Sequence, residues 1–135
     1  KLNNIDALIN IIVTNYFEPK NNFNFINNLL NTNIIEFGKK IKLLRSLDLI
    51  DNSTQQKLQK LSSIRNSFAH AEVKNVTHFS TKNEDLNVRK MIVVMSSNGK
   101  ISKKYVSELY EDFKLLFEET FSKLNEISIK LINKK

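Results

Sequence analysis

The sequence predicts a mainly α-helical bundle with a small β-hairpin inserted before a long C-terminal helix. Apolar residues recur at helical spacing over most of the chain. Val73–Ser80, in contrast, has β-branched residues in partial alternation, and after a polar turn at 81–87 the residues Val88–Met95 form a strand-like run. The chain contains only two glycines and one proline, which favours long helices and few tight turns. At 135 residues we expect a single domain, residues 1–135, that buries a core without covalent cross-links.

The helical pattern divides into segments at polar breaks. Pro19 ends the first segment because proline cannot continue the hydrogen-bond ladder. Asn33 and Ser53 have the sequence of N-caps, with Glu36 and Gln56 three residues later at the position that completes a capping box. The pattern predicts helices at about 2–17, 23–30, 34–47, 54–70 and 102–133, and a β-hairpin at about 73–100. Ser97, Asn98, Gly99 and Lys100 have the sequence of a tight turn.

Gly38 lies inside the third predicted helix, where glycine costs roughly 1 kcal/mol relative to alanine. Close packing of another helix is the interpretation we favour. The approach of a nucleic-acid backbone is the alternative.

The last predicted helix has a continuous apolar seam. Its spacings alternate between four and three residues, as in a heptad, with one polar position. Such a seam predicts a core or a partner-helix contact and not a cofactor site. Its members are Val106, Tyr110, Phe113, Phe117, Thr120, Leu124, Ile127 and Leu131.

Composition excludes several classes of function. There is no cysteine, so disulfides and thiolate metal sites are absent, and a reducing, cytoplasmic location is expected. No apolar run reaches the length of a membrane span. The sequence has no phosphate-cradling glycine loop, no H-E-x-x-H and no Cys/His cluster, so we expect no cofactor and no metal. Lys1 is not a natural start, which is compatible with a chain cut from a longer protein.

The formal net charge is +7, which attracts phosphates irrespective of sequence. The lysines form no dense block, however, so a solvated surface is the interpretation for most of them. His78, on the first predicted strand, has no ligand-like neighbours and is expected to be structural or exposed.

The stretch Ile64–His70 carries the clearest chemistry, because it reads Arg-Asn-x3-His at the end of a predicted helix. A histidine can move protons to and from the 2′-hydroxyl and the leaving oxygen of RNA. An arginine can hold the phosphate and stabilise its developing charge. Arg65 and His70 are five residues apart, about 140° on a regular helix. They converge only if the helix ends near Ala69 or if two chains contribute.

This motif resembles the signature of the HEPN superfamily, Arg-x4-6-His, often with a polar residue directly after the arginine. The blocks Phe37–Leu44 and Leu47–Asp51 are similar to the branch that includes the mannitol-repressor family, and the resemblance covers residues 34–70. It implies a helical bundle that forms a homodimer with the two motifs facing each other.

The resemblance implies a metal-independent endoribonuclease, acting as a toxin or defence effector, with RNA as substrate. His70 would carry the proton, Arg65 would bind the phosphate and Asn66 would position the backbone, leaving a 2′,3′-cyclic phosphate. A neutralising or regulatory protein partner is compatible with this activity.

The alternative is a non-catalytic, dimeric binding or regulatory module similar to the mannitol-repressor family. In that interpretation Arg65 pairs with an acidic residue and Asn66 hydrogen-bonds the backbone. His70 then interacts favourably with the helix C-terminus.

Overall fold

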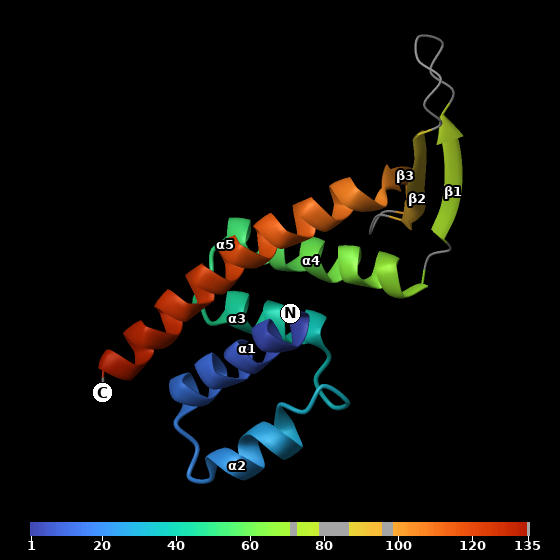
Figure 1. The fold of residues 1–135 in the computed structure, drawn as a ribbon. Coiled ribbons are helices and arrows are strands. Elements are labelled where there is room, and N and C mark those ends of the chain that lie inside the picture. Colours follow the sequence, from blue (N-terminus) through green and yellow to red (C-terminus); the bar gives the residue numbers. More distant parts are fainter. Residues whose placement is uncertain (71–72, 79–86, 96–98, 135) are drawn as a thin grey trace. The chain divides into compact units, whose positions relative to one another are not determined.

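A computed structural model describes residues 1–70, 73–78, 87–95 and 99–134, without the side chains of 70, 73–78, 87–89 and 93–95. The described part is mainly helical, with antiparallel strands before a long C-terminal helix, which confirms the predicted fold class. No described helix has both the length and the apolar character needed to span a bilayer. The elements, in chain order, are α1 (Leu2–Phe17), α2 (Asn22–Asn24), the π-helical turn η1 (Phe25–Leu29), α3 (Phe37–Ser46), α4 (Asn52–His70), β1 (Val73–His78), β2 (Asn87–Met95), β3 (Ile101–Tyr105) and α5 (Val106–Asn133) (Figure 1).

The chain forms two compact units. The first contains residues 1–61 and 116–135, and therefore α1, α2, η1, α3, the start of α4 and the C-terminal part of α5. The second contains residues 62–115, and therefore the end of α4, the three strands and the start of α5. The Arg-Asn-x3-His motif belongs to the second unit.

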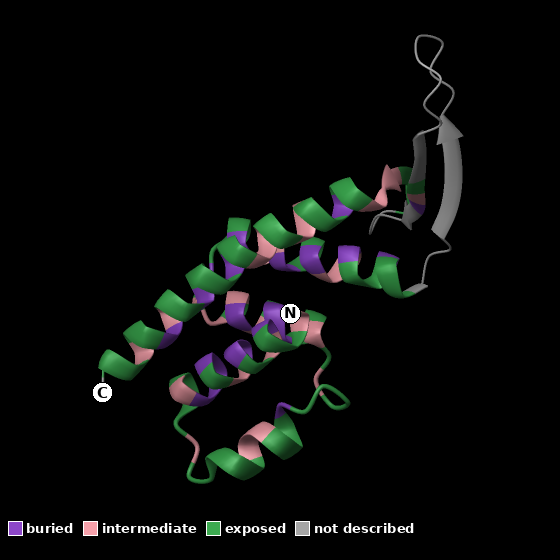
Figure 2. Cartoon of the chain, viewed as in Figure 1, coloured by how far each residue is buried: buried purple, intermediate pink, exposed green. Residues whose placement is uncertain are grey.

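The core of the first unit is aliphatic. α1 buries one side, as its spacing predicts, and α3, α4 and α5 add further side chains (Figure 2). Full burial of one such side chain stabilises a fold by roughly 1.5–3 kcal/mol, so this cluster is the main source of stability in the unit. Its members are Ile5, Leu8, Ile9, Ile12, Val13, Leu30, Ile41, Leu44, Ile50, Leu58, Leu61 and Leu124.

One ion pair joins α1 to α3 inside this unit. The Lys40 side chain is fully buried, and its Nζ lies 2.8 Å from Oδ1 and 3.0 Å from Oδ2 of Asp6. The Thr32 hydroxyl donates a further hydrogen bond of 3.2 Å to Asp6 Oδ2. The Asp6 side chain keeps 20% of its surface exposed, so only the lysine is completely withdrawn from water.

The start of α3 differs from the capping-box prediction. The helix begins at Phe37, with Glu36 as a cap residue that makes no side-chain capping bond. Asn33 lies before the helix begins, in an Asx turn in which the Asn31 side chain accepts the Asn33 N–H at Oδ1 over a distance of 2.9 Å. The predicted Asn33 cap is therefore wrong.

The cap of α4 also differs from the prediction. Asp51 Oδ1 accepts the Thr54 N–H at 2.7 Å, so the helix starts at Asn52. Asp51, and not Ser53, caps this helix. The carboxylate supplies a charged acceptor two residues earlier than the hydroxyl that the sequence pattern favoured.

Gly38 is exposed, and a Cβ built on it would meet no atom of the described residues within 4 Å. The interpretation that a second helix packs closely against this glycine is therefore wrong.

The β segment contains three antiparallel strands in the order β1-β2-β3 (Figure 1). The predicted hairpin is present as β1 and β2, with Val73 opposite Ile92 and His78 opposite Asn87. β3 adds to it, with Met91 opposite Tyr105 and Met95 opposite Ile101. α5 consequently begins at Val106 and not near residue 102, because pairing with β2 takes up the residues before it.

The turns between the strands fall mostly outside the described residues. The predicted polar turn at 81–87 lies outside them except for Asn87, the first residue of β2. Of the predicted tight turn at 97–100, Gly99 has a positive φ of 79°, which glycine adopts without steric cost.

The heptad seam of α5 is buried in part. Thr120 and Leu124 are buried, and most of the other seam residues are half-buried. Tyr110 is 51% exposed, whereas its neighbour Leu109 is buried. The buried stripe at the start of α5 therefore runs through position 109 and not 110.

Candidate functional site

Arg65 and Asn66 lie on the solvent side of α4. Both are exposed, while Ile64 before them and Ser67 after them are buried. The Ser67 hydroxyl donates to the Ser63 carbonyl at 2.9 Å, which satisfies the buried hydroxyl within the helix itself. The amphipathic pattern of α4 therefore presents the first two motif residues to solvent. Phe68, four residues after the buried Ile64, is exposed.

The guanidinium of Arg65 is held by its neighbour. Arg65 Nη1 donates to Asn66 Oδ1 at 3.1 Å. Within the described part of the chain, Arg65 forms no ion pair with a carboxylate. A guanidinium has five N–H donors, so this bond to Asn66 leaves several for an anion. The structural interpretation expected an acidic partner for Arg65 and a backbone partner for Asn66, and neither is found among these residues.

His70 is the last residue of α4, and its side chain lies outside the described residues. The helix continues to His70, so positions 65 and 70 are about 140° apart around its axis. Helix geometry therefore does not direct them to one point on a single chain. His78 ends β1, and its side chain is also outside the described residues.

The described residues contain no cluster of three or more His, Asp or Glu side chains that could hold a metal ion. The acidic pairs Glu111–Asp112 and Glu118–Glu119 on α5 form no such site. One of these residues, Glu119, instead forms an ion pair of 2.8 Å with Lys57 in the first unit.

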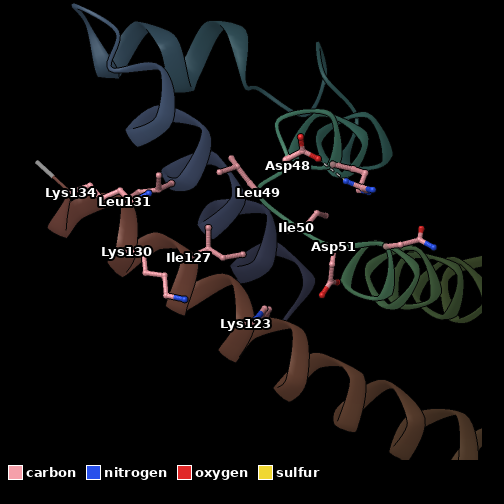
Figure 3. Close-up of a pocket in the computed structure, with 11 residues that line it drawn as sticks. Asp48, Leu49, Ile50, Asp51, Lys123, Ile127, Lys130, Leu131 and Lys134 are labelled. Atoms are coloured by element: carbon pink, nitrogen blue, oxygen red, sulfur yellow. Dashed lines mark hydrogen bonds and ion pairs between the residues drawn. The ribbon is translucent and has the colours of Figure 1, made fainter.

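The first unit contains a cleft of about 540 Å³ that the sequence analysis did not single out (Figure 3). One side is formed by the connection between α3 and α4, and the other by the C-terminal part of α5. The cleft has an aliphatic surface between basic and acidic groups. Its lining residues are Arg45, Asp48, Leu49, Ile50, Asp51, Asn52, Lys123, Ile127, Lys130, Leu131 and Lys134. Lys123, Ile127 and Lys130 share a helix face by their spacing of four and three, which is the signal that could have found this cleft.

The charges of this cleft are partly neutralised from within. Arg45 Nη1 pairs with Asp48 Oδ1 at 3.0 Å. The Thr54 backbone N–H, and then the Thr54 side chain, donate to Asp51 and lower the pKa of its carboxyl, with smaller contributions from Lys123 and Lys57. The lining has no histidine, serine or tyrosine. It could accept an anion with an apolar part, but it lacks the proton carrier that RNA cleavage requires.

Searches against models of protein families, curated proteins and solved structures find no match for this chain.

Proposed function

We propose that this protein is a metal-independent endoribonuclease of HEPN type, with Arg65, Asn66 and His70 as its catalytic residues. The observation that carries the proposal is the state of Arg65. It is exposed, it is oriented by Asn66, and no described carboxylate neutralises it. An arginine held in this way suits the binding of a phosphodiester, because a planar guanidinium can donate two parallel hydrogen bonds to one phosphate.

Cleavage would proceed without a metal. His70 would take the proton from a 2′-hydroxyl, whose oxygen attacks the adjacent phosphorus and displaces the 5′-oxygen of the next nucleotide. The departing oxygen takes up a proton, and the products are a 2′,3′-cyclic phosphate and a 5′-hydroxyl. Arg65 would stabilise the charge that develops on the phosphoryl oxygens, and Asn66 would hold Arg65 in place.

A homodimer belongs to this proposal. Positions 65 and 70 lie on different sides of α4, so Arg65 of one chain and His70 of another would complete one site. The resemblance to HEPN domains supports the same arrangement, with the two motifs facing each other. A role as toxin or defence effector, with a neutralising partner, would follow from the activity.

The test is cleavage of a mixed RNA pool in EDTA by the wild type and by Arg65→Ala, Asn66→Ala and His70→Ala. We expect His70→Ala to lower the rate by about 10²–10⁴, the usual contribution of a general acid or base. Arg65→Ala should cause a similar loss, and Arg65→Lys should not restore full activity because lysine lacks the guanidinium fork. Ser62→Ala, one turn earlier on α4, is the control.

Thermal melting of each variant separates catalysis from folding. An inactive wild type, or a His70→Ala variant that cuts as fast as the wild type, would leave the non-catalytic binding module as the better description. Unfolding of His70→Ala would assign the histidine a structural role instead.

A further inference from the structure

The three strands of the second unit are basic throughout. They contain five cationic residues and no aspartate or glutamate: Lys74 in β1, Arg89 and Lys90 in β2, and Lys103 and Lys104 in β3. The whole chain has 21 basic and 14 acidic residues, so two acids for every three bases would be ordinary for it. Strand pairing therefore brings together cations that are far apart in sequence and excludes carboxylates from the sheet itself.

The strand register assigns these positions to two faces. Val73, Ile92 and Lys104 are opposite one another and share a face, and Ile92 is only 1% exposed. We call it the packed face because it holds the buried Ile92, although Lys90 and Ser102 on the same face are exposed. Successive residues of a strand alternate between faces, so Lys74, Met91 and Tyr105, which are also opposite one another, belong to the other face.

Three of the five cationic positions belong to this second face, which we call the open face. Lys103 is opposite Val93, Lys74 is opposite Met91, and Arg89 is opposite Val76. Along β2 these are three successive levels of the same face, about 7 Å apart at two residues each. Each level therefore contributes one cationic position.

Two of the four described side chains of the open face are exposed and two are half-buried. Lys103 is exposed, and Ile101 is 67% exposed. Met91 and Tyr105 are half-buried. The open face thus combines regularly spaced basic positions with an aromatic ring, whereas the packed face holds the buried Ile92.

We propose that the open face binds single-stranded RNA. The evenly spaced cationic positions match a ligand that repeats a negative charge, and they would release counterions from its phosphates. Tyr105 would offer a ring on which a base can stack, which single-strand binders use irrespective of sequence. The choice of RNA as ligand rests on the proposed nuclease function. The basic character of the open face does not, since it follows from the register and the strand composition alone.

The experiment measures binding separately from cleavage. A fluorescently labelled single-stranded RNA with 2′-O-methyl riboses lacks the attacking hydroxyl, so it can be bound and not cut. The full chain is titrated into this RNA, and fluorescence anisotropy measures binding at salt concentrations of about 50 to 200 mM. Over this range the affinity of a protein that contacts phosphates falls strongly as salt rises. The triple variant Lys74→Gln/Arg89→Gln/Lys103→Gln should bind more weakly, and its slope of log affinity against log salt should fall by about 2, at 0.7 for each lost phosphate contact.

Two controls have the same charge change as the variants they match. Lys20→Gln/Lys39→Gln/Lys42→Gln removes three exposed cations of the first unit and should keep most of the salt slope. Lys90→Gln removes an exposed cation from the packed-face register and should affect binding less than Lys103→Gln. If the triple variant has a lowered melting temperature, the comparison of Lys103→Gln with Lys90→Gln decides the result.

Three outcomes would overturn the proposal. These are no RNA binding at the lowest salt, equal losses in the variants and their controls, and binding to phosphatidylglycerol vesicles but not to RNA. If the sheet variants bind RNA more weakly but the wild type cuts no RNA, the RNA-binding role of the open face stands and the nuclease proposal fails. If the sheet variants bind RNA as well as the wild type does and the wild type cuts RNA efficiently, the nuclease proposal stands and the RNA-binding role of the open face fails.

Discussion

At the scale of single residues, the ion pair between the buried Lys40 and Asp6 is the feature of the first unit that is most sensitive to substitution. Removing one partner of a buried pair leaves the other charge uncompensated, which typically costs 3–5 kcal/mol. The two partners are not equivalent here, because Asp6 retains contact with water and Lys40 does not. A carboxylate left alone can still be hydrated, whereas the ammonium cannot.

We therefore expect Asp6→Ala to lower the free energy of unfolding by more than Lys40→Met, with about 3 kcal/mol for the aspartate variant. Urea unfolding of both variants measures the difference. Lys39→Met, an exposed neighbour on α3, should change stability by less than about 0.5 kcal/mol. Equal losses for the two ion-pair variants would show that the lysine is hydrated in solution.

Asp51 gives the fold a dependence on pH. Its hydrogen bond from the Thr54 N–H holds the carboxyl pKa below its usual value of 3.8. A carboxyl whose pKa is lowered by folding stabilises the fold above its unfolded pKa. It loses that contribution as pH falls through its folded pKa.

The prediction is that Asp51→Ala lowers the melting temperature at pH 7 and that the difference from the wild type shrinks below about pH 4. Asp51→Asn keeps an acceptor for the Thr54 N–H and should lose less at pH 7. Ser53→Ala tests the cap that the sequence suggested and should be nearly neutral. If Ser53→Ala lowered the melting temperature more than Asp51→Ala does, Ser53 and not Asp51 would be the residue that caps α4.

At the scale of elements, the two glycines of the chain should respond to alanine in opposite ways. Gly38 is in the first turn of α3 with open space around it, so Gly38→Ala should stabilise the fold by up to about 1 kcal/mol. Gly99 has a φ of 79°, so Gly99→Ala should be destabilising. Chemical denaturation of both variants checks the signs. A destabilising Gly38→Ala would mean that something packs against α3 in solution.

The sequence predicted the elements whose signals are local. The apolar stripe of α1 gave its bounds to the residue, and the β-branched run located β2. The third strand was missed because Ile101–Tyr105 becomes a strand only by pairing with β2, and a periodic helix follows it directly. The caps were misplaced for a similar reason. Several polar side chains near each helix start can accept a hydrogen bond from a backbone N–H, and the backbone geometry determines which of them does. The side chains that do so are Asn31, for the Asn33 N–H, and Asp51, for the Thr54 N–H.

The candidate site shows the same division. The residue types of the Arg-Asn-x3-His motif were enough to single out Arg65 and Asn66, and both are exposed on α4. The basic face of the sheet could not be seen in that way. Lys74, Arg89 and Lys103 are far apart along the chain and form no dense block, and only the register of three strands brings them to one face.

At the scale of the whole molecule, assembly decides whether the motif can act. Arg65 and His70 diverge around α4, so we predict that catalysis requires two chains. Sedimentation at tens of micromolar, about the range in which weak dimers still associate, should find a dimer. A monomer at that concentration would contradict the shared site directly.

Mixing two inactive variants tests the shared site more sharply than the oligomeric state does. In a site built from Arg65 of one chain and His70 of its partner, a mixed dimer of Arg65→Ala and His70→Ala holds one site with both mutations and one intact site. Random exchange makes about half of the dimers mixed, so about a quarter of the wild-type rate should return in a symmetric dimer. Each variant alone should stay inactive, and the double variant mixed with Arg65→Ala should restore nothing, because neither chain of that mixture supplies Arg65. If both residues of a site came from one chain, mixing would restore no activity in any combination.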